Sequence, residues 1–150
     1  MKKLFIYYSL TGNGDLIAEN LKNKKGVAIR KVQTLKKFPK FKVAQILKCG
    51  FLASINSKAK LKDFDSNLKG YDEIIIGSPI WNARLSTPIN TVLDELDLSK
   101  KKLTFVLYSG SGSAPKAVDK ITELYPDAKI ICTKEPKNKK KDLDKTLIIV

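Results

Sequence analysis

The sequence predicts one α/β domain, a three-layer α/β/α sandwich around a five-stranded parallel sheet. Short apolar runs that favour strands alternate with helical patterns along the whole chain. This alternation is typical of a parallel sheet whose faces are both covered by helices. The length of 150 residues suits a single core, and no internal repeat or change of composition divides the chain.

The predicted strands are short runs of apolar and β-branched residues. The third of them, YDEIIIG, contains an unbroken apolar run, as expected for a strand buried on both faces. The strands are expected at residues 4–8, 27–32, 71–77, 103–108 and 128–133.

The predicted helices show apolar residues at a spacing of three to four. Gly26 ends the first of them, and Thr87 and Pro88 mark the start of the third. The helices are expected at residues 13–24, 43–55, 86–96 and 114–125. Residues 142–150 are interpreted as a short final helix or an extended tail, and residues 36–42, 58–70 and 78–85 as linker or loops.

With this spacing the five strands fit the order 2-1-3-4-5. In sheets of that order a ligand binds at the carboxyl ends of strands 1 and 3. The loops that follow strands 1, 3 and 4 are therefore the candidate site.

The first loop, SLTGNG at residues 9–14, joins a strand to the start of a helix. Unpaired backbone N–H groups and the positive end of the helix dipole meet there, which favours an anion such as phosphate. Ser9, Thr11 and Asn13 could add side-chain hydrogen bonds, and Gly12 and Gly14 allow close approach. The alternative is an ordinary turn with a helix cap.

The second loop contains Trp81, which is the only tryptophan of the chain and directly follows a buried strand. A flat aromatic side chain at a cleft rim suits stacking on a planar heterocycle. The alternative is a tryptophan that packs back on the core as a lid.

The third loop, SGSGS at residues 109–113, has side chains too small to cover its backbone. Its N–H and C=O groups would be open to the edge of a ligand, although a flexible turn before a helix has the same composition. A phosphate cradle, an aromatic plate and an open backbone edge together predict a site for a phosphorylated planar cofactor.

The three loops resemble the FMN-contacting regions of short-chain flavodoxins and flavodoxin-like proteins. SLTGNG is similar to their S/T-x-T-G-N-T phosphate loop, and GSPIW and the SGSG segment are similar to their two flavin loops. The resemblance implies a flavodoxin-like fold and FMN as the cofactor. It implies an FMN site made of three groups of residues, namely Ser9, Leu10, Thr11, Gly12, Asn13 and Gly14; Pro79, Ile80, Trp81, Asn82 and Ala83; and Ser109, Gly110, Ser111 and Gly112.

Two positions depart from the family pattern. Gly14 stands where the family usually has threonine, so one phosphate-binding hydroxyl is missing. Asn82 and Ala83 stand where many members have a glycine whose peptide flips when the flavin is reduced. Asparagine adopts positive φ more readily than most residues, so the flip remains available but is less free.

The chain is strongly basic, with a formal net charge of +14. Only Arg30 and Arg84 are arginines, and the lysines are scattered, which argues for a solvated surface and against nucleic-acid binding. We expect a redox partner protein with an acidic docking face. The oligomeric state is left open.

Other classes of site are poorly supported. The chain has no histidine, and Cys49 and Cys132 form no C-x-x-C pair, so no zinc site, histidine triad or thioredoxin motif is expected. Cys132 lies in an apolar run and is expected to be buried and inert. No apolar run approaches the roughly 18–20 residues that span a bilayer, and no signal peptide is recognisable, so a cytoplasmic protein is expected.

We therefore expect a small FMN-binding protein that acts as a low-potential electron carrier between redox partners and has no catalytic side chains of its own. The alternative is an NAD(P)H-dependent flavin or quinone reductase on the same fold, in which Arg84 could receive a pyridine-nucleotide phosphate. A fold that has lost FMN and binds RNA or protein through its basic surface also remains open.

Overall fold

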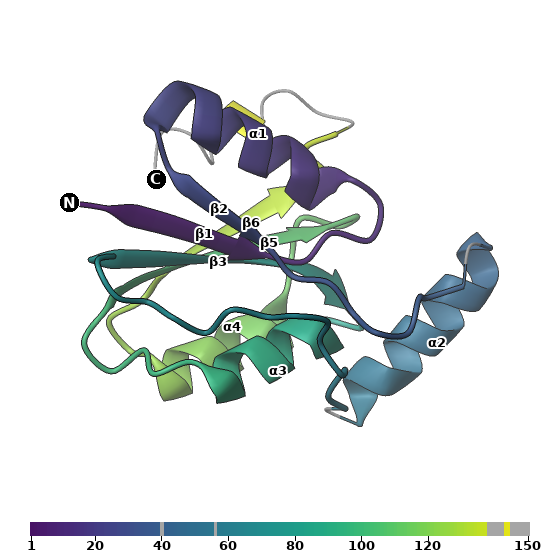
Figure 1. The fold of residues 1–150 in the computed structure, drawn as a ribbon. Helices are drawn as coiled ribbons and strands as arrows, with labels where there is room; N and C mark the ends of the chain where they lie inside the picture. The colour runs from purple at the N-terminus through teal and green to yellow at the C-terminus, as the bar shows by residue number, and fades with distance from the viewer. Residues whose placement is uncertain (40, 56, 138–142, 145–150) are drawn as a thin grey trace.

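In the computed structural model, a parallel sheet lies between two layers of helices (Figure 1). The structure describes residues 1–39, 41–55, 57–137 and 143–144. The strands are β1 (Lys3–Tyr7), β2 (Ala28–Lys31), β3 (Glu73–Trp81), β4 (Arg84–Leu85), β5 (Lys102–Ser109) and β6 (Lys129–Lys134). The helices are α1 (Asn13–Lys25), α2 (Lys42–Ser54), α3 (Thr87–Glu95) and α4 (Pro115–Leu124).

The five parallel strands have the order β2-β1-β3-β5-β6, which confirms the predicted order 2-1-3-4-5. Helix α1 covers one face of the sheet, and α3 and α4 cover the other (Figure 1). Helix α2 projects beyond the carboxyl ends of the strands, at the edge where β1 and β3 end.

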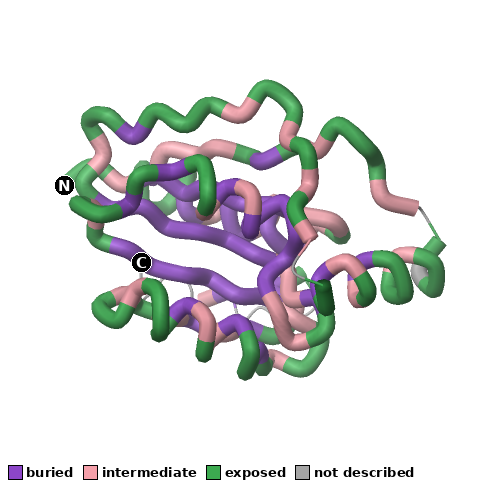
Figure 2. The backbone as a smooth tube through the Cα atoms, turned by 90° about the horizontal axis from the view of Figure 1, so that it is seen from below, coloured by how far each residue is buried: buried purple, intermediate pink, exposed green. Residues whose placement is uncertain are grey.

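Side chains alternate along the buried strands and so build a core on each face of the sheet. Phe5 and Ile75 pack with Ile17 and Leu21 of α1, whereas Ile6 and Ile76 belong to the core beneath the other helices. Figure 2 shows the central strands buried along most of their length. Because the sheet is enclosed on both faces, only its strand ends are available for a site.

The predicted loop at residues 78–85 is wrong. Strand β3 continues through Pro79 to Trp81 and pairs with β5 as far as Tyr108, and the chain then turns back into β4. Asn82 and Ala83 form the two-residue turn with φ of 50° and 62°, the positive values of a type I′ hairpin. Proline seldom lies inside a strand, so Pro79 hides this extension of β3 from a prediction by local pattern.

The ends of the helices follow the expected signals. Gly26 has φ of 63°, and its N–H donates to the carbonyl of Lys22 at the end of α1. Pro88 lies in the first turn of α3. The predicted final helix at residues 142–150 lies outside the described residues except for Leu143, which is buried on the α1 side, and Asp144. Among the described helices, none is both long and apolar enough to cross a membrane.

Candidate functional site

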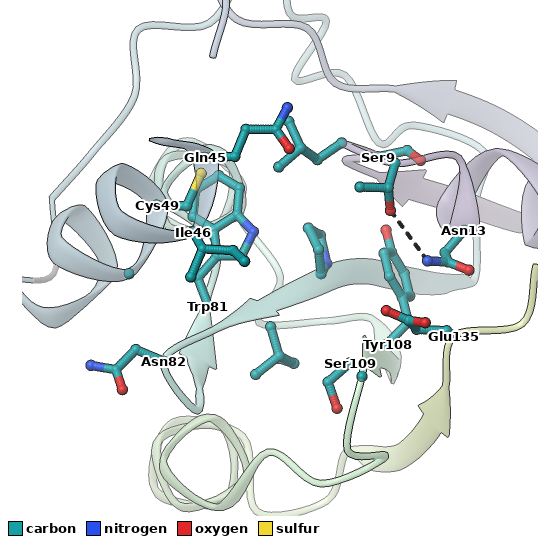
Figure 3. A pocket seen from close by; sticks show the side chains of 16 residues that line it. Ser9, Asn13, Gln45, Ile46, Cys49, Trp81, Asn82, Tyr108, Ser109 and Glu135 are labelled. Atoms are coloured by element: carbon teal, nitrogen blue, oxygen red, sulfur yellow. Dashed lines mark hydrogen bonds between the residues drawn. The ribbon is translucent and has the colours of Figure 1, made fainter. Parts of the chain in front are cut away.

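A cavity of about 430 Å³ opens at the carboxyl ends of the strands (Figure 3). It lies between the loop after β1, the ends of β3 and β5, and helix α2. Ten of the sequence-predicted site residues line it, namely Ser9, Leu10, Thr11, Asn13, Pro79, Ile80, Trp81, Asn82, Ser109 and Gly110. The three loops that the sequence singled out therefore meet at one cavity.

The other five predicted residues do not line this cavity. Gly12, with φ of 96°, precedes α1, and Gly14 is buried in its first turn. Ala83 lies in the hairpin turn, and its carbonyl accepts a hydrogen bond from the N–H of Ala117 at 2.8 Å. Ser111 and Gly112 belong to the turn that follows β5.

The loop after β1 is held by its own side chains. The Oγ of Ser9 accepts hydrogen bonds from the N–H groups of Gly12 at 3.2 Å and Asp15 at 3.4 Å. The amide of Asn13 donates to Thr11 Oγ1 at 3.3 Å (dashed in Figure 3). These hydrogen bonds hold the loop in one conformation. The hydroxyl of Ser9 only accepts in them, so it keeps its own hydrogen to donate to an anion.

Lys137 adds a positive charge at this loop that the sequence analysis missed. Its backbone N–H donates to Asn13 Oδ1 at 2.9 Å, and its Nζ donates to the carbonyl of Thr11 at 3.4 Å. The residue follows β6, far from the loop in the sequence. Its lysine-rich segment gave no sign of this contact, because only the folding of the sheet brings the two together.

Trp81 belongs to an aromatic cluster. Its ring meets Tyr8 edge-on at 6.0 Å and Phe38 at 5.1 Å between ring centroids. Only 7% of the residue is exposed, so the indole is not the open plate that stacking suggested. It contributes to both the core and the cavity wall, where it lies beside Cys49 and Ile46 of α2 (Figure 3).

Helix α2 supplies a wall of the cavity that no sequence signal indicated. The residues of α2 that line the cavity are Gln45, Ile46, Cys49 and Gly50. Tyr108 and Glu135 also line it and were not among the predicted site residues. A helical pattern shows that a helix forms, but it does not show where the helix lies.

Cys132 is less buried than the sequence predicted. Cys132 is half-buried, whereas Cys49 is buried and lines the cavity. Burial raises the pKa of the Cys49 thiol to about 11, and the charge of nearby Lys48 opposes this only in part. At neutral pH the thiol is protonated, which argues against a nucleophilic or metal-binding role.

The sequence profile of the flavodoxin family matches residues 2–147. No curated protein sequence matches the chain.

Several solved structures share the fold. A candidate flavoprotein from Bacteroides eggerthii has a TM-score of 0.73 at 22% identity, over 99% of this chain and 97% of that one. A flavoprotein from Lactobacillus acidophilus, solved in complex with FMN, has a TM-score of 0.69 at 23% identity, over 94% of this chain and 97% of that one. Oxidised flavodoxin 1 from Bacillus cereus has a TM-score of 0.54 at 16% identity, over 99% of this chain and 94% of that one.

Proposed function

The chain belongs to the flavodoxin family, and we propose that it binds FMN in the cavity at the ends of β1, β3 and β5 and carries electrons between redox proteins. The observation that carries the proposal is the convergence of the three loops on this one cavity. The similar flavoprotein of L. acidophilus was solved in complex with FMN, which supports the choice of cofactor.

The residues of the cavity fit the two chemically different ends of FMN. Hydroxyl and amide groups of Ser9, Thr11 and Asn13 gather at one end, next to the charge of Lys137. Trp81 and Ile80 give the cavity an aromatic and apolar region. A volume of about 430 Å³ is within the usual range for small-molecule sites, roughly 300–1,000 Å³.

We assign the phosphate to the loop after β1. The start of α1 provides backbone N–H groups and the positive end of the helix dipole, and Lys137 adds a full charge. Ser9, Thr11 and Asn13 would hold the phosphate by hydrogen bonds. Gly12 and Gly14 shape the loop from outside the cavity.

We assign the flavin ring to the apolar region of the cavity. Trp81 would contact the ring, and Ser109 and Gly110 would meet its polar edge. Leu10, Pro79, Ile80 and Asn82 complete the walls. When bound, the flavin supplies the redox chemistry, and the protein supplies orientation and a shielded environment.

The reductase alternative needs a site for a pyridine nucleotide. Arg84 was the candidate for its phosphate, but the guanidinium donates to the carbonyl of Asn82 at 3.3 Å within the hairpin. We therefore favour the carrier. Steady oxidation of NADH or NADPH by the pure FMN-loaded protein would decide for the reductase.

A titration of FMN with the flavin-free protein tests the proposal. We expect stoichiometric quenching of flavin fluorescence at micromolar protein, and a loss of affinity in Trp81→Ala. The matched control is Tyr71→Ala, since Tyr71 is half-exposed and precedes β3 at the opposite end of the sheet. Circular dichroism of both variants checks that they fold. Absence of quenching by the folded wild-type protein would overturn the proposal.

A further inference from the structure

Helix α2 exposes most of its large apolar side chains. Ile46, Leu47 and Phe51 are 72%, 69% and 65% exposed, and Val43 is exposed next to them. Of the α2 side chains that the structure describes, the buried ones are Cys49 and Ala53. The helix projects from the end of the sandwich (Figure 1), and exposed residues dominate it.

The other helices bury most of their large apolar side chains and expose mainly polar ones. Ile17 and Leu21 of α1 and Ile121 of α4 are buried, and their exposed faces are mainly polar. A helix with apolar residues around most of its circumference is ordinarily covered. A contiguous exposed apolar patch of this kind is typical of an interaction site.

A second cavity, of about 410 Å³, lies beside α2 and is lined by Lys48 and Leu52 of this helix. Leu35, Phe38 and Leu52 give it an apolar lining. Five lysines also line it, namely Lys36, Lys37, Lys48, Lys58 and Lys60. We call this cavity the lysine groove.

The lysine groove contains a polar group without a partner. Thr87 lines it and is buried, and its Oγ1 has no hydrogen-bond partner among the described residues. A buried hydroxyl is ordinarily satisfied, but the oxygen of Thr87 is itself enclosed, so it offers no hydrogen bond to a partner seated in the groove.

The walls of the lysine groove are tied together. The N–H of Leu35 donates to the carbonyl of Lys60 at 3.0 Å, and Thr34 pairs with Leu61. The Oγ1 of Thr91 bonds to both the N–H and the carbonyl of Ala59, at 3.0 and 2.8 Å. The groove is therefore formed before anything binds.

The charge around this surface is of one sign. No aspartate or glutamate occurs in the sequence between Glu19 and Asp63. Lys58 pairs with Asp94, but within the described part of the chain the other four groove lysines have no ion-pair partner. A second copy of the chain would bring lysines against lysines, whereas carboxylates would be attracted.

The surface is continuous with the candidate FMN cavity. Ile46 lines that cavity and is also exposed on the outer face of α2. A macromolecule seated on α2 would therefore lie at the mouth of the cavity.

We propose that α2 and the lysine groove form a docking surface for a protein whose contact element is apolar at its centre and bordered by aspartate or glutamate. The apolar centre covers Leu47 and Phe51, and the carboxylates pair with the groove lysines. That the partner exchanges electrons with the cofactor rests on the proposed function, but the docking surface does not.

The test uses two designed helical peptides that carry leucines at the same positions and either glutamates or lysines beside them. Binding is followed by fluorescence anisotropy. We expect the glutamate peptide to bind, with an affinity that falls as salt rises, and the lysine peptide not to bind. Leu47→Ser/Phe51→Ser and Lys36→Glu/Lys60→Glu should each weaken binding about tenfold or more, since each removes one half of the contact.

The matched control is Leu124→Ser, at a 54% exposed apolar position on α4, which should bind the peptide as the wild type does. Equal binding by all variants, or no binding of the glutamate peptide by wild type, would overturn the proposal. So would dimers that dissociate in Leu47→Ser/Phe51→Ser, or binding to phosphatidylglycerol vesicles in place of the peptide. An FMN titration of the same samples separates the two proposals: peptide binding without FMN binding overturns only the proposed cofactor.

Discussion

The phenolic oxygen of Tyr108 occupies the space in which a side chain at position 14 would begin. A Cβ atom placed on Gly14 would lie 2.6 Å from Tyr108 Oη and 2.8 Å from Tyr7 Cδ2. Tyr108 is buried and donates its hydroxyl hydrogen to the carbonyl of Tyr8. Glycine at position 14, in the first turn of α1, is therefore required by the two tyrosines beside it.

Gly14→Ala should destabilise the protein, although alanine is the better helix former. We expect a loss of about 1–3 kcal/mol in the free energy of unfolding from overpacking. The cost should be smaller in a Tyr108→Phe background, because the nearest atom is then absent. Urea denaturation of the wild type, the two single variants and the double variant measures the coupling energy between positions 14 and 108.

Gly50→Ala is the matched control, since a Cβ at Gly50 in α2 would meet nothing within 4 Å. This substitution should stabilise by about 0.5–1 kcal/mol through helix propensity alone. Equal costs of Gly14→Ala with and without the Tyr108 hydroxyl would show that the two residues are not coupled.

Ala83→Gly should stabilise the hairpin between β3 and β4. Ala83 has φ of 62°, a conformation that costs an alanine roughly 1–2 kcal/mol and a glycine little. After the larger backbone entropy of glycine is allowed for, we expect a gain of about 0.5 kcal/mol in thermal or urea unfolding. Ala44→Gly in α2 should have the opposite sign, and a loss of stability in Ala83→Gly would contradict the type I′ turn.

Lys137→Met should weaken the binding of FMN and leave that of riboflavin unchanged, because only FMN has a phosphate. The Nζ of Lys137 lies 3.4 Å from the carbonyl of Thr11, within the proposed phosphate loop. We expect the FMN dissociation constant to rise about three- to tenfold, as for one partly exposed charge-assisted contact. Lys129→Met, at the exposed start of β6, is the control. A parallel loss of riboflavin affinity would mean that Lys137 acts on the fold and not on the phosphate.

Cys49 should react slowly with iodoacetamide in a Cys132→Ser background. With its pKa raised to about 11 by burial, the thiolate fraction at pH 8 is on the order of one in a thousand. The labelling rate should rise about tenfold per pH unit up to about pH 11, and bound FMN should slow it because Cys49 lines the cavity. Rapid labelling at pH 8 would place the thiol in solvent.

The same shift gives a pH dependence of stability. A folded pKa of about 11 above the ordinary value of 9.0 means that the folded state keeps its proton longer than the unfolded state. The contribution to stability is complete below pH 9 and is lost as the pH rises toward 11. Cys49→Ala should flatten the stability curve in that window, as measured by urea denaturation at several pH values.

Much of the fold followed from local patterns. The apolar runs and helical spacings located all five parallel strands and four helices, and Gly26 fixed the end of α1. The hairpin at Asn82 and Ala83 was missed, since strand pairing across Pro79 outweighs the local signal of a proline.

The sequence by itself determined where the strands and helices form and the composition of the three loops, because periodicity and loop composition act over a few neighbouring residues. Only the tertiary structure decided that Lys137 reaches the first loop, that α2 walls the cavity and that Tyr108 leaves room only for Gly14. Each of these contacts joins residues far apart in the chain. Their positions depend on how the whole sheet and its helices pack, and no local pattern encodes that.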